Sequence, residues 1–214
     1  MGKCIIMCAG EFTPLEIEKD ETDLVIAADN GLTYFMQTGV LPDLIIGDFD
    51  SLSPEGKELL ADMERDGFKE TIRLPKEKDD TDTMAAVKEG FKRGYTDFRL
   101  YAALGGRLDH TVANIQTLAY ILEHGGRGYI MDAHQMVFMM KNETRSFAAG
   151  FRGTVSLFSY GKRAEGVTLR GMKYPLTDGA LTNDFPLGVS NEISEEETAC
   201  ITVSDGTLLA VVSF

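Results

Sequence analysis

The chain has 214 residues, of which 43% are hydrophobic and 26% are charged, and its 34 Asp and Glu against 21 Lys and Arg leave a net charge of −13. This composition is typical of a globular protein with a substantial core, and it excludes disorder as a description of the whole chain. The acidic balance argues against nucleic acid as a partner, which requires a surplus of Lys and Arg, and against an anionic membrane surface. The longest apolar runs fall far short of the roughly 20 residues that cross a membrane.

The first apolar run, Cys4–Ala9, has the length of a strand, and no cleavage signature of a signal peptide follows it. Cys4 and Cys8 lie four residues apart in this expected strand, hence about 13 Å apart, which is too far for a disulfide. Cys200 is the third cysteine of the chain. From this cysteine usage we expect a reduced, cytoplasmic protein.

Up to about residue 133, short apolar runs alternate with longer segments of helical periodicity. The expected strands are Lys3–Ala9, Leu24–Ala28, Asp43–Gly47, Thr71–Leu74, Phe98–Leu104 and Gly128–Asp132. The expected helices are Pro54–Arg65, Asp82–Arg93 and Asp109–Glu123, each followed within two residues by a glycine. Strands that alternate with helices predict a mostly parallel sheet with flanking helices.

From about Gln135 onward the helical periodicity disappears. The expected strands are now Val137–Met140, Thr154–Ser159, Gly166–Arg170, Ala199–Val203 and Leu208–Ser213. The dipeptide Asp205-Gly206 between the last two strands predicts a tight β-hairpin. The sequence therefore predicts an α/β domain over residues 1–133 and an all-β sandwich domain over residues 134–214.

Acidic side chains follow four successive expected strands, from Asp29 after the second to Asp109 after the fifth, at the sheet edge where ligands bind in open α/β folds. Asp48 and Asp50 follow the third strand, and in extended chain their carboxylates point the same way, about 6–7 Å apart at the backbone. Asp79, Asp80 and Asp82 follow the fourth strand. Carboxylates so placed predict a Mg²⁺ ion, which proteins hold with one or two carboxylates and substrate phosphates. The alternative is a solvated turn whose acids cap the next helix.

Gly105-Gly106-Arg107 opens the helix that follows the fifth strand. Backbone amides at a glycine-rich helix N-terminus, together with a guanidinium group, form a site for a phosphate group. The alternative is a tight turn with a surface arginine. Neither the P-loop motif nor the G-x-G-x-x-G dinucleotide motif occurs, so we expect phosphate chemistry without a common nucleotide motif.

Taken together, the segments at these strand ends resemble the thiamine pyrophosphokinase family. They are ADNG (Ala28–Gly31), PDLIIGDFDSL (Pro42–Leu52), KDDTD (Lys78–Asp82) and GGRLDH (Gly105–His110). The later segments GMKYPLTDGAL (Gly171–Leu181) and GVSNE (Gly188–Glu192) are similar to the thiamine-site signature of that family, and the polar segment after Gly188 is expected to form a loop. The resemblance covers nearly the whole chain in order. One departure is Asn30-Gly31, where the family often has two glycines after the aspartate.

The resemblance implies Mg²⁺-dependent transfer of the β,γ-diphosphate of ATP to the hydroxyethyl oxygen of thiamine, with release of AMP. It also implies an ATP-binding α/β domain, a thiamine-binding β-sandwich, and a homodimer whose sites are built by both chains. The residues carried over by position are the metal ligands Asp48, Asp50 and Asp82, the ATP-binding residues Asp29, Asn30, Gly31, Lys78, Thr81, Gly105, Gly106, Arg107 and Asp109, and the thiamine-binding residues Ser190 and Asn191. Asp48, Asp50, Asp82 and Asp109 are the expected catalytic residues, with Asp82 or Asp109 as acceptor of the alcohol proton.

Such a transfer depends mainly on positioning and charge neutralisation, which an acidic metal site and a glycine-rich anion site supply. Two other functions are considered. A phosphatase of the haloacid dehalogenase type would use LIIGDFDSL as its D-x-D-x-[ST] motif, but that motif normally follows the first strand. A non-catalytic sensor of nucleotide or thiamine would not need the full set of acids.

Overall fold

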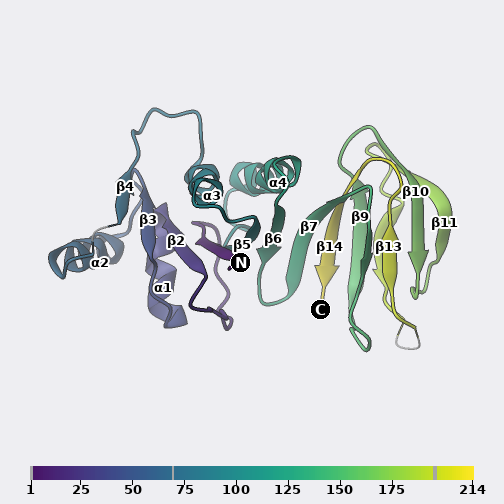
Figure 1. Ribbon diagram of the computed structural model, residues 1–214, viewed down its shortest axis with the longest axis horizontal. Helices are drawn as coiled ribbons and strands as arrows, with labels where there is room; N and C mark the ends of the chain where they lie inside the picture. The colour runs from purple at the N-terminus through teal and green to yellow at the C-terminus, as the bar shows by residue number, and fades with distance from the viewer. Residues whose placement is uncertain (1, 69, 195–196) are drawn as a thin grey trace. The chain divides into compact units, whose positions relative to one another are not determined.

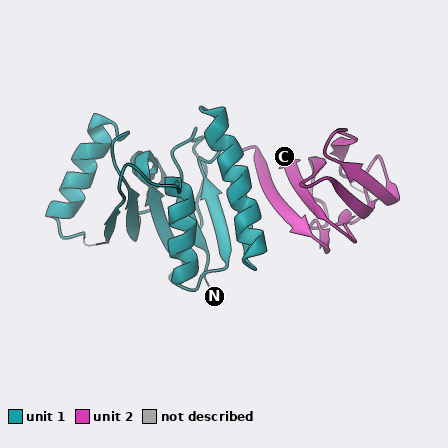
Figure 2. Ribbon diagram, turned by 90° about the horizontal axis from the view of Figure 1, so that it is seen from above, with its two compact units in different colours: residues 1–133 teal, residues 134–214 magenta. Residues whose placement is uncertain are grey.

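The computed structural model describes residues 2–68, 70–194 and 197–214. The chain forms two compact units, Met1–Ala133 and His134–Phe214 (Figure 2). No helix in the described part of the chain is long and apolar enough to cross a membrane.

The first unit is built on a sheet of six parallel strands. They are β1 (Cys4–Met7), β2 (Leu24–Ala28), β3 (Leu44–Gly47), β4 (Thr71–Arg73), β5 (Asp97–Tyr101) and β6 (Arg127–Met131). Their spatial order is β6-β5-β1-β2-β3-β4 (Figure 1). The chain runs outward from β1 to β4 and then returns to the other side of β1 with β5. The order therefore reverses between β1 and β5, and ligands of open α/β sheets bind at such a switch point.

Helices cover both faces of this sheet, which explains why its central strands are continuous apolar runs. The helices are α1 (Leu32–Thr38), α2 (Pro54–Arg65), α3 (Asp82–Lys92) and α4 (Leu108–Glu123), with a short 3-10 helix, η1 (Asp29–Gly31), before α1. Helices α1 and α2 pack together against one face, which includes Ile5 and Met7. Helices α3 and α4 pack together against the other. There, a Cβ atom on Gly90 would lie 2.6 Å from Phe98 and 2.9 Å from Cys4, so glycine allows α3 to approach the sheet.

The predicted helices begin where their capping signals lie. Helix α2 starts at Pro54, and the Ser53 hydroxyl accepts a hydrogen bond from the Gly56 N–H at 3.1 Å. The Thr81 hydroxyl caps α3 in the same way, through the Met84 N–H at 3.1 Å. Helix α1 was not predicted from the sequence because its seven residues are too few for a clear period. The fifth strand ends at Tyr101 rather than Leu104 because Ala102 has a φ of 50°.

The second unit consists of antiparallel strands in two arrays. They are β7 (Gln135–Lys141), β8 (Thr144–Ser146), β9 (Thr154–Ser159), β10 (Arg163–Arg170), β11 (Leu176–Thr182), β12 (Gly188–Glu192), β13 (Cys200–Thr202) and β14 (Thr207–Ser213). The pairing orders are β12-β9-β14-β7 and β11-β10-β13-β8. Alternate residues are buried, as Leu208, Ala210 and Val212 are in β14. Alternating burial of this kind is typical of a β-sandwich, in which one face of each sheet packs in the core and the other faces solvent.

Two local predictions in this unit are wrong. Asp205-Gly206 does not close a hairpin, because β13 pairs with β8 and β10 whereas β14 pairs with β7 and β9. The turn instead links the two arrays, and the Gly206 N–H donates to Asn142 Oδ1 at 2.9 Å. The segment Gly188–Glu192, expected to be a loop, is the edge strand β12, paired with β9 across a bulge.

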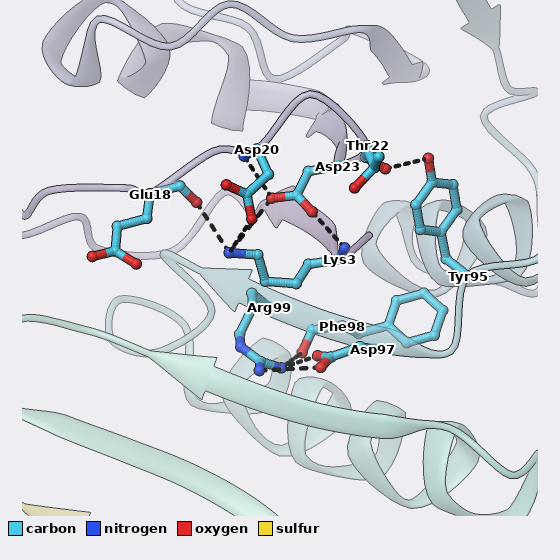
Figure 3. Close-up of polar contacts among 9 residues, drawn as sticks. All are labelled: Lys3, Glu18, Asp20, Thr22, Asp23, Tyr95, Asp97, Phe98 and Arg99. Carbon is cyan, nitrogen blue, oxygen red and sulfur yellow. Dashed lines mark hydrogen bonds and ion pairs between the residues drawn. The ribbon is translucent and has the colours of Figure 1, made fainter. Parts of the chain in front are cut away.

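A buried carboxylate ties the start of β1 to the loop before β2 (Figure 3). Asp23 accepts hydrogen bonds from the backbone N–H groups of Lys3 at 2.6 Å and Asp20 at 3.0 Å, and the Lys3 ammonium lies 3.5 Å away. Burial opposes ionisation of this side chain, but these hydrogen bonds and the Lys3 charge prevail and lower the pKa of Asp23. The folded chain therefore stabilises the ionised form of Asp23.

We expect Asp23→Asn to lower the free energy of unfolding by about 2–3 kcal/mol at pH 7, because an amide cannot accept both backbone hydrogen bonds. Since folding depresses the pKa of Asp23, its contribution is complete above the unfolded pKa of about 4 and is lost as the pH falls through the folded pKa. Urea denaturation at pH 7 and pH 3 should thus give a smaller difference at pH 3. Asp20→Asn, at a side chain that is 79% exposed, is the control.

Candidate functional site

A cavity of about 400 Å³ lies in the first unit, at the carboxyl ends of its strands and the first turns of α3 and α4. Its wall includes Ala9, Gly10, Glu11, Asp29, Asn30, Ser51, Thr81, Asp82, Gly105, Gly106, Arg107, His110 and Asn114. Seven of the residues singled out in the sequence are thus brought together: Asp29, Asn30, Thr81, Asp82, Gly105, Gly106 and Arg107. The cavity lies where the strand order reverses, as the fold predicts.

The backbone is strained where three strands reach this edge. Asp29, Phe49 and Ala102 have φ values of 48°, 62° and 50°, and they follow the ends of β2, β3 and β5. Residues other than glycine rarely adopt this left-handed conformation. Such strain persists only where the surrounding structure imposes it, and it clusters at functional sites.

Two predicted metal ligands meet around a lysine. The Lys78 ammonium lies 3.2 Å from Asp48 Oδ2 and 2.8 Å from Asp82 Oδ1, and the side chains of Lys78 and Asp48 are each 14% exposed. The Asp50 backbone N–H, which donates to Asp48 Oδ1 at 3.1 Å, and the Lys78 ammonium lower the pKa of Asp48. Burial opposes charge on Lys78, but hydrogen bonds and charges from Asp82 and Asp48 prevail and raise the pKa of Lys78. Two carboxylates therefore share one ammonium at neutral pH.

The third predicted ligand, Asp50, lies apart from this pair. Its carboxylate is half-exposed and lies 3.4 Å from the ammonium of Lys76. Asp80 is likewise engaged elsewhere, by Lys88 at 2.6 Å. Within the described ranges, no group of three or more Asp, Glu, His or Cys side chains is placed to hold a metal.

Asp29 lines the cavity together with Asp82. It is 7% exposed; its Oδ2 accepts a hydrogen bond from the Ser51 hydroxyl, and its buried Oδ1 has no hydrogen-bond partner among the described residues. Burial, assisted by the charges of Asp82 and Asp48, raises the pKa of Asp29 although the Ser51 hydrogen bond opposes the shift. Because a buried acceptor without a partner is costly, this oxygen is suited to a cation or a ligand donor.

The glycine turn after β5 donates a hydrogen bond to a carboxylate of the chain. Gly105 and Gly106 have φ values of 77° and 62°, and the Gly106 N–H donates to Glu11 Oε1 at 2.9 Å. The next residue, Arg107, forms an ion pair of 2.6 Å with Asp109, and both side chains are exposed. The hydrogen bond from Arg107 lowers the pKa of Asp109, so this carboxylate is a poor proton acceptor. Asp109 also does not line the cavity.

The cavity is also lined by Glu11, Ser51 and Asn114, which were not predicted as site residues from the sequence. The strand-end rule that pointed to the other loops applies equally to β1, whose carboxyl end leads to Glu11. By contrast, the predicted Gly31 is not in the cavity wall. A Cβ atom there would lie 2.1 Å from the Met7 carbonyl oxygen, so this glycine is required for close packing against β1.

The second unit has a smaller, mainly apolar cavity of about 180 Å³. It is lined by Leu169, Tyr174, Pro175, Leu176, Leu181, Leu187, Gly188, Val189 and Asn191. Asn191 is 6% exposed, and its carboxamide accepts from the Tyr174 N–H at 2.9 Å and donates to the Tyr174 carbonyl at 2.8 Å. Ser190 is exposed, has a φ of 59°, and its N–H donates to Ser156 Oγ at 3.0 Å. Asn191 thus holds the Tyr174 segment beside the cavity.

Two family models match the chain. The one described as thiamin pyrophosphokinase, catalytic domain, matches residues 15–130, and the one described as thiamin pyrophosphokinase, vitamin B1 binding domain, matches residues 141–208. The chain is 25% identical to thiamine pyrophosphokinase of Bacillus subtilis, over 81% of this chain and 80% of that protein. It is 27% identical to thiamine pyrophosphokinase 3 of Oryza sativa subsp. japonica, over 80% and 66%, respectively.

Solved structures share the fold. The crystal structure of thiamine pyrophosphokinase from Bacillus subtilis has a TM-score of 0.86 and 23% identity, covering 100% of this chain and 99% of that one. The crystal structure of yeast thiamin pyrophosphokinase has a TM-score of 0.73 and 16% identity, covering 100% and 86%. The mixed α/β fold with a C-terminal β domain, predicted from the sequence, is thereby confirmed. Because the catalytic-domain model spans more than half of the 214 residues, the chain belongs to the thiamin pyrophosphokinase family.

Proposed function

We propose that the protein transfers the β,γ-diphosphate of ATP to the hydroxyethyl oxygen of thiamine and releases AMP, with Mg²⁺ as cofactor. Membership of the family supports the activity and does not favour a dehalogenase-type phosphatase or a sensor. The observation that carries the assignment of the reacting site is the cavity at the switch point, whose wall includes Asp29, Asp82 and the glycine turn. Lys78 and Asp48 do not line this cavity, but Lys78 links Asp48 to Asp82 in its wall. Such a cavity matches the needs of phosphoryl transfer.

The donor set suits Mg²⁺, which prefers carboxylate oxygens. Asp48 and Asp82 are the proposed principal ligands, and the unpartnered Oδ1 of Asp29 supports a cation in this region. Asp50 is the proposed third ligand because it follows the same strand as Asp48; its half-exposed carboxylate, which lies against Lys76, would have to turn toward the ion. When bound, the ion supplies charge neutralisation on the diphosphate. We propose that Lys78 then exchanges its carboxylate partners for phosphate oxygens.

The remaining nucleotide contacts come from the strand-end loops. Asn30, Thr81 and the turn of Gly105-Gly106-Arg107 are the proposed ATP ligands that line the cavity. We assign the alcohol proton to Asp82 rather than to Asp109, because Asp82 lines the cavity whereas Asp109 is exposed and paired with Arg107. Apart from this proton, the protein positions the reactants and compensates charge.

The test is an assay for AMP by chromatography, with purified protein, ATP, Mg²⁺ and thiamine. AMP should form in a one-to-one ratio with thiamine diphosphate and only when thiamine is present. Release of inorganic phosphate from simple phosphomonoesters, with a stable phosphoryl group on Asp48, would instead favour the phosphatase. Binding of ATP and thiamine without any AMP would favour the sensor.

We propose that the second unit binds thiamine beside its apolar cavity. Thiamine carries a neutral aminopyrimidine and a cationic thiazolium, so its site requires a few polar groups and an apolar wall. Ser190 lies on the exposed side of β12, and Asn191 fixes the backbone of Tyr174 in the cavity wall. Asn191 would then act on thiamine mainly by holding this wall in place.

We expect Asn191→Ala to raise the KM for thiamine about tenfold or more and to leave the KM for ATP nearly unchanged. Because the Tyr174 N–H and carbonyl lose their partners, the free energy of unfolding of the variant should fall by about 2–3 kcal/mol, and its melting temperature should fall with it. Steady-state kinetics and thermal denaturation measure the two effects. Ser190→Ala, which removes one exposed hydroxyl, should change the KM for thiamine by a smaller factor and leave the melting temperature unaltered. Equal effects of Asn191→Ala on both substrates would contradict the assignment.

We also propose a homodimer in the cytoplasm. Several large apolar side chains of the second unit are exposed, and those of Tyr174, Phe185, Leu187 and Val189 are exposed by 46–64%. Tyr174, Leu187 and Val189 lie together around one cavity, and contiguous exposed apolar groups mark interaction surfaces. The free thiols of Cys4, Cys8 and Cys200 are compatible with a reducing compartment. Sedimentation should give a particle of twice the 23.5 kDa chain mass.

A further inference from the structure

We propose that Glu11 is a displaceable internal carboxylate that occupies the phosphate-binding turn at Gly105–Gly106 and weakens nucleotide binding. The inference rests on the proposed function, which places a phosphate group at this turn. Its first support is the hydrogen bond of 2.9 Å from the Gly106 N–H to Glu11 Oε1. Its second is proximity: a Cβ atom on Gly105 would lie 2.6 Å from both Cδ and Oε2 of Glu11. The carboxylate therefore lies directly on the turn.

The backbone around Glu11 is held in place from the opposite side of the switch point. The Gly10 N–H donates to the Ala102 carbonyl at 2.7 Å, and the Glu11 N–H donates to the Leu104 carbonyl at 2.8 Å. The loop after β1 is thus bonded to the loop after β5, and the two loops frame the crevice. With its backbone so fixed, Glu11 needs only side-chain rotation to leave the turn. As Glu11 is exposed, its carboxylate can return to water without a large solvation change.

A carboxylate and a phosphate offer the same chemistry to this turn, namely anionic oxygens that accept N–H hydrogen bonds. The guanidinium of Arg107, two residues from the Gly105 backbone, is also engaged by a carboxylate of the chain, that of Asp109. A diphosphate must therefore replace Glu11 at the Gly106 N–H before it can use the turn. Because the charged hydrogen bond to Glu11 is stronger than a neutral one, this competition lowers the affinity for the nucleotide.

The experiment compares the wild-type chain with Glu11→Gln, which keeps the shape of the side chain and removes its charge. Isothermal titration with ATP and Mg²⁺, without thiamine, should give a Kd about five to ten times lower for the variant. Titration with inorganic diphosphate should show the same change. In the full reaction, the KM for ATP should fall while kcat stays unchanged. Glu16→Gln, an exposed acid of the same loop outside this cavity, makes the same change in net charge and should bind as the wild type does.

The outcomes separate the inference from the function on which it rests. An unchanged Kd in Glu11→Gln, with ordinary ATP binding by the wild type, would overturn the competition alone. Weaker binding would also overturn it, because Glu11 would then be a direct nucleotide ligand. A gain in Glu16→Gln equal to that in Glu11→Gln would assign the effect to net charge and overturn the specific contact. If neither chain binds ATP or diphosphate, the nucleotide site itself is wrong, and both proposals fail.

Discussion

Replacing Asp48 with Asn is expected to lower kcat by about 10³-fold or more while the chain keeps its fold. The substitution keeps the size of the side chain but removes the charge that would hold Mg²⁺ against the diphosphate. Loss of such a ligand at a developing charge costs several kcal/mol of barrier. Asp82→Asn should have an effect of the same order, because the carboxylates of Asp48 and Asp82 both contact the Lys78 ammonium and therefore lie close together. AMP release measures the rate, and circular dichroism verifies the fold.

Asp79→Asn is the matched control, since Asp79 is an exposed acid of the loop that leads to Asp82, and it does not line the cavity. It should have nearly wild-type turnover. Asp50→Asn tests the third proposed ligand, and a loss comparable to that of Asp48→Asn is expected. If turnover of Asp50→Asn falls by less than tenfold, Asp48 and Asp82 hold the metal without Asp50. Ordinary turnover of a folded Asp48→Asn protein would exclude the metal assignment.

Lys78→Met is expected to separate the two roles that we propose for this lysine. Without the ammonium, Asp48 and Asp82 repel each other, so the variant should unfold at a lower temperature in EDTA and regain stability when Mg²⁺ is added. Because the ammonium no longer competes with a metal ion for the two carboxylates, Mn²⁺ should bind the nucleotide-free variant about tenfold or more tightly than it binds the wild type. Turnover should nevertheless fall about 10²-fold, because the phosphates lose a positive partner.

Lys88→Met provides the control, because Lys88 in α3 pairs with Asp80 in the loop before that helix, and neither residue lines the cavity. It should affect neither Mn²⁺ affinity nor turnover. Electron paramagnetic resonance of Mn²⁺ and thermal denaturation with and without Mg²⁺ are the two measurements. Unchanged Mn²⁺ affinity in Lys78→Met would show that the ammonium and the metal do not compete for one place.

Local signals in the sequence predicted much of the fold. Helix α2 has the predicted bounds Pro54–Arg65, because an N-cap serine, a proline at the first helical position and a glycine after its end are properties of neighbouring residues. The central strands were recognisable as apolar runs because helices bury both of their faces. The family, too, followed from segments that are contiguous in the chain.

Errors arose where structure depends on which distant segments pair. Asp205-Gly206 has the sequence of a hairpin turn, yet the flanking strands find better partners in two different arrays. Asp50 remains a proposed ligand, but its carboxylate does not point the same way as that of Asp48, as extended chain would have placed it. The backbone turns at Phe49, whose φ is 62°, and Asp50 lies instead against Lys76. A period-two argument holds only while the chain stays extended.

By itself, the sequence determined the types of the long elements, the division into α/β and β parts and the family, because each depends on local pattern or composition. It also predicted chemical groups for the site. Only the tertiary structure decided which of these groups meet. The return of the chain from β4 to β5 places β5 beside β1, and so brings Glu11 to the Gly106 N–H, 95 residues further along the chain. Strand order follows from the packing of helices on both faces of the sheet, and that packing is not encoded in any single segment.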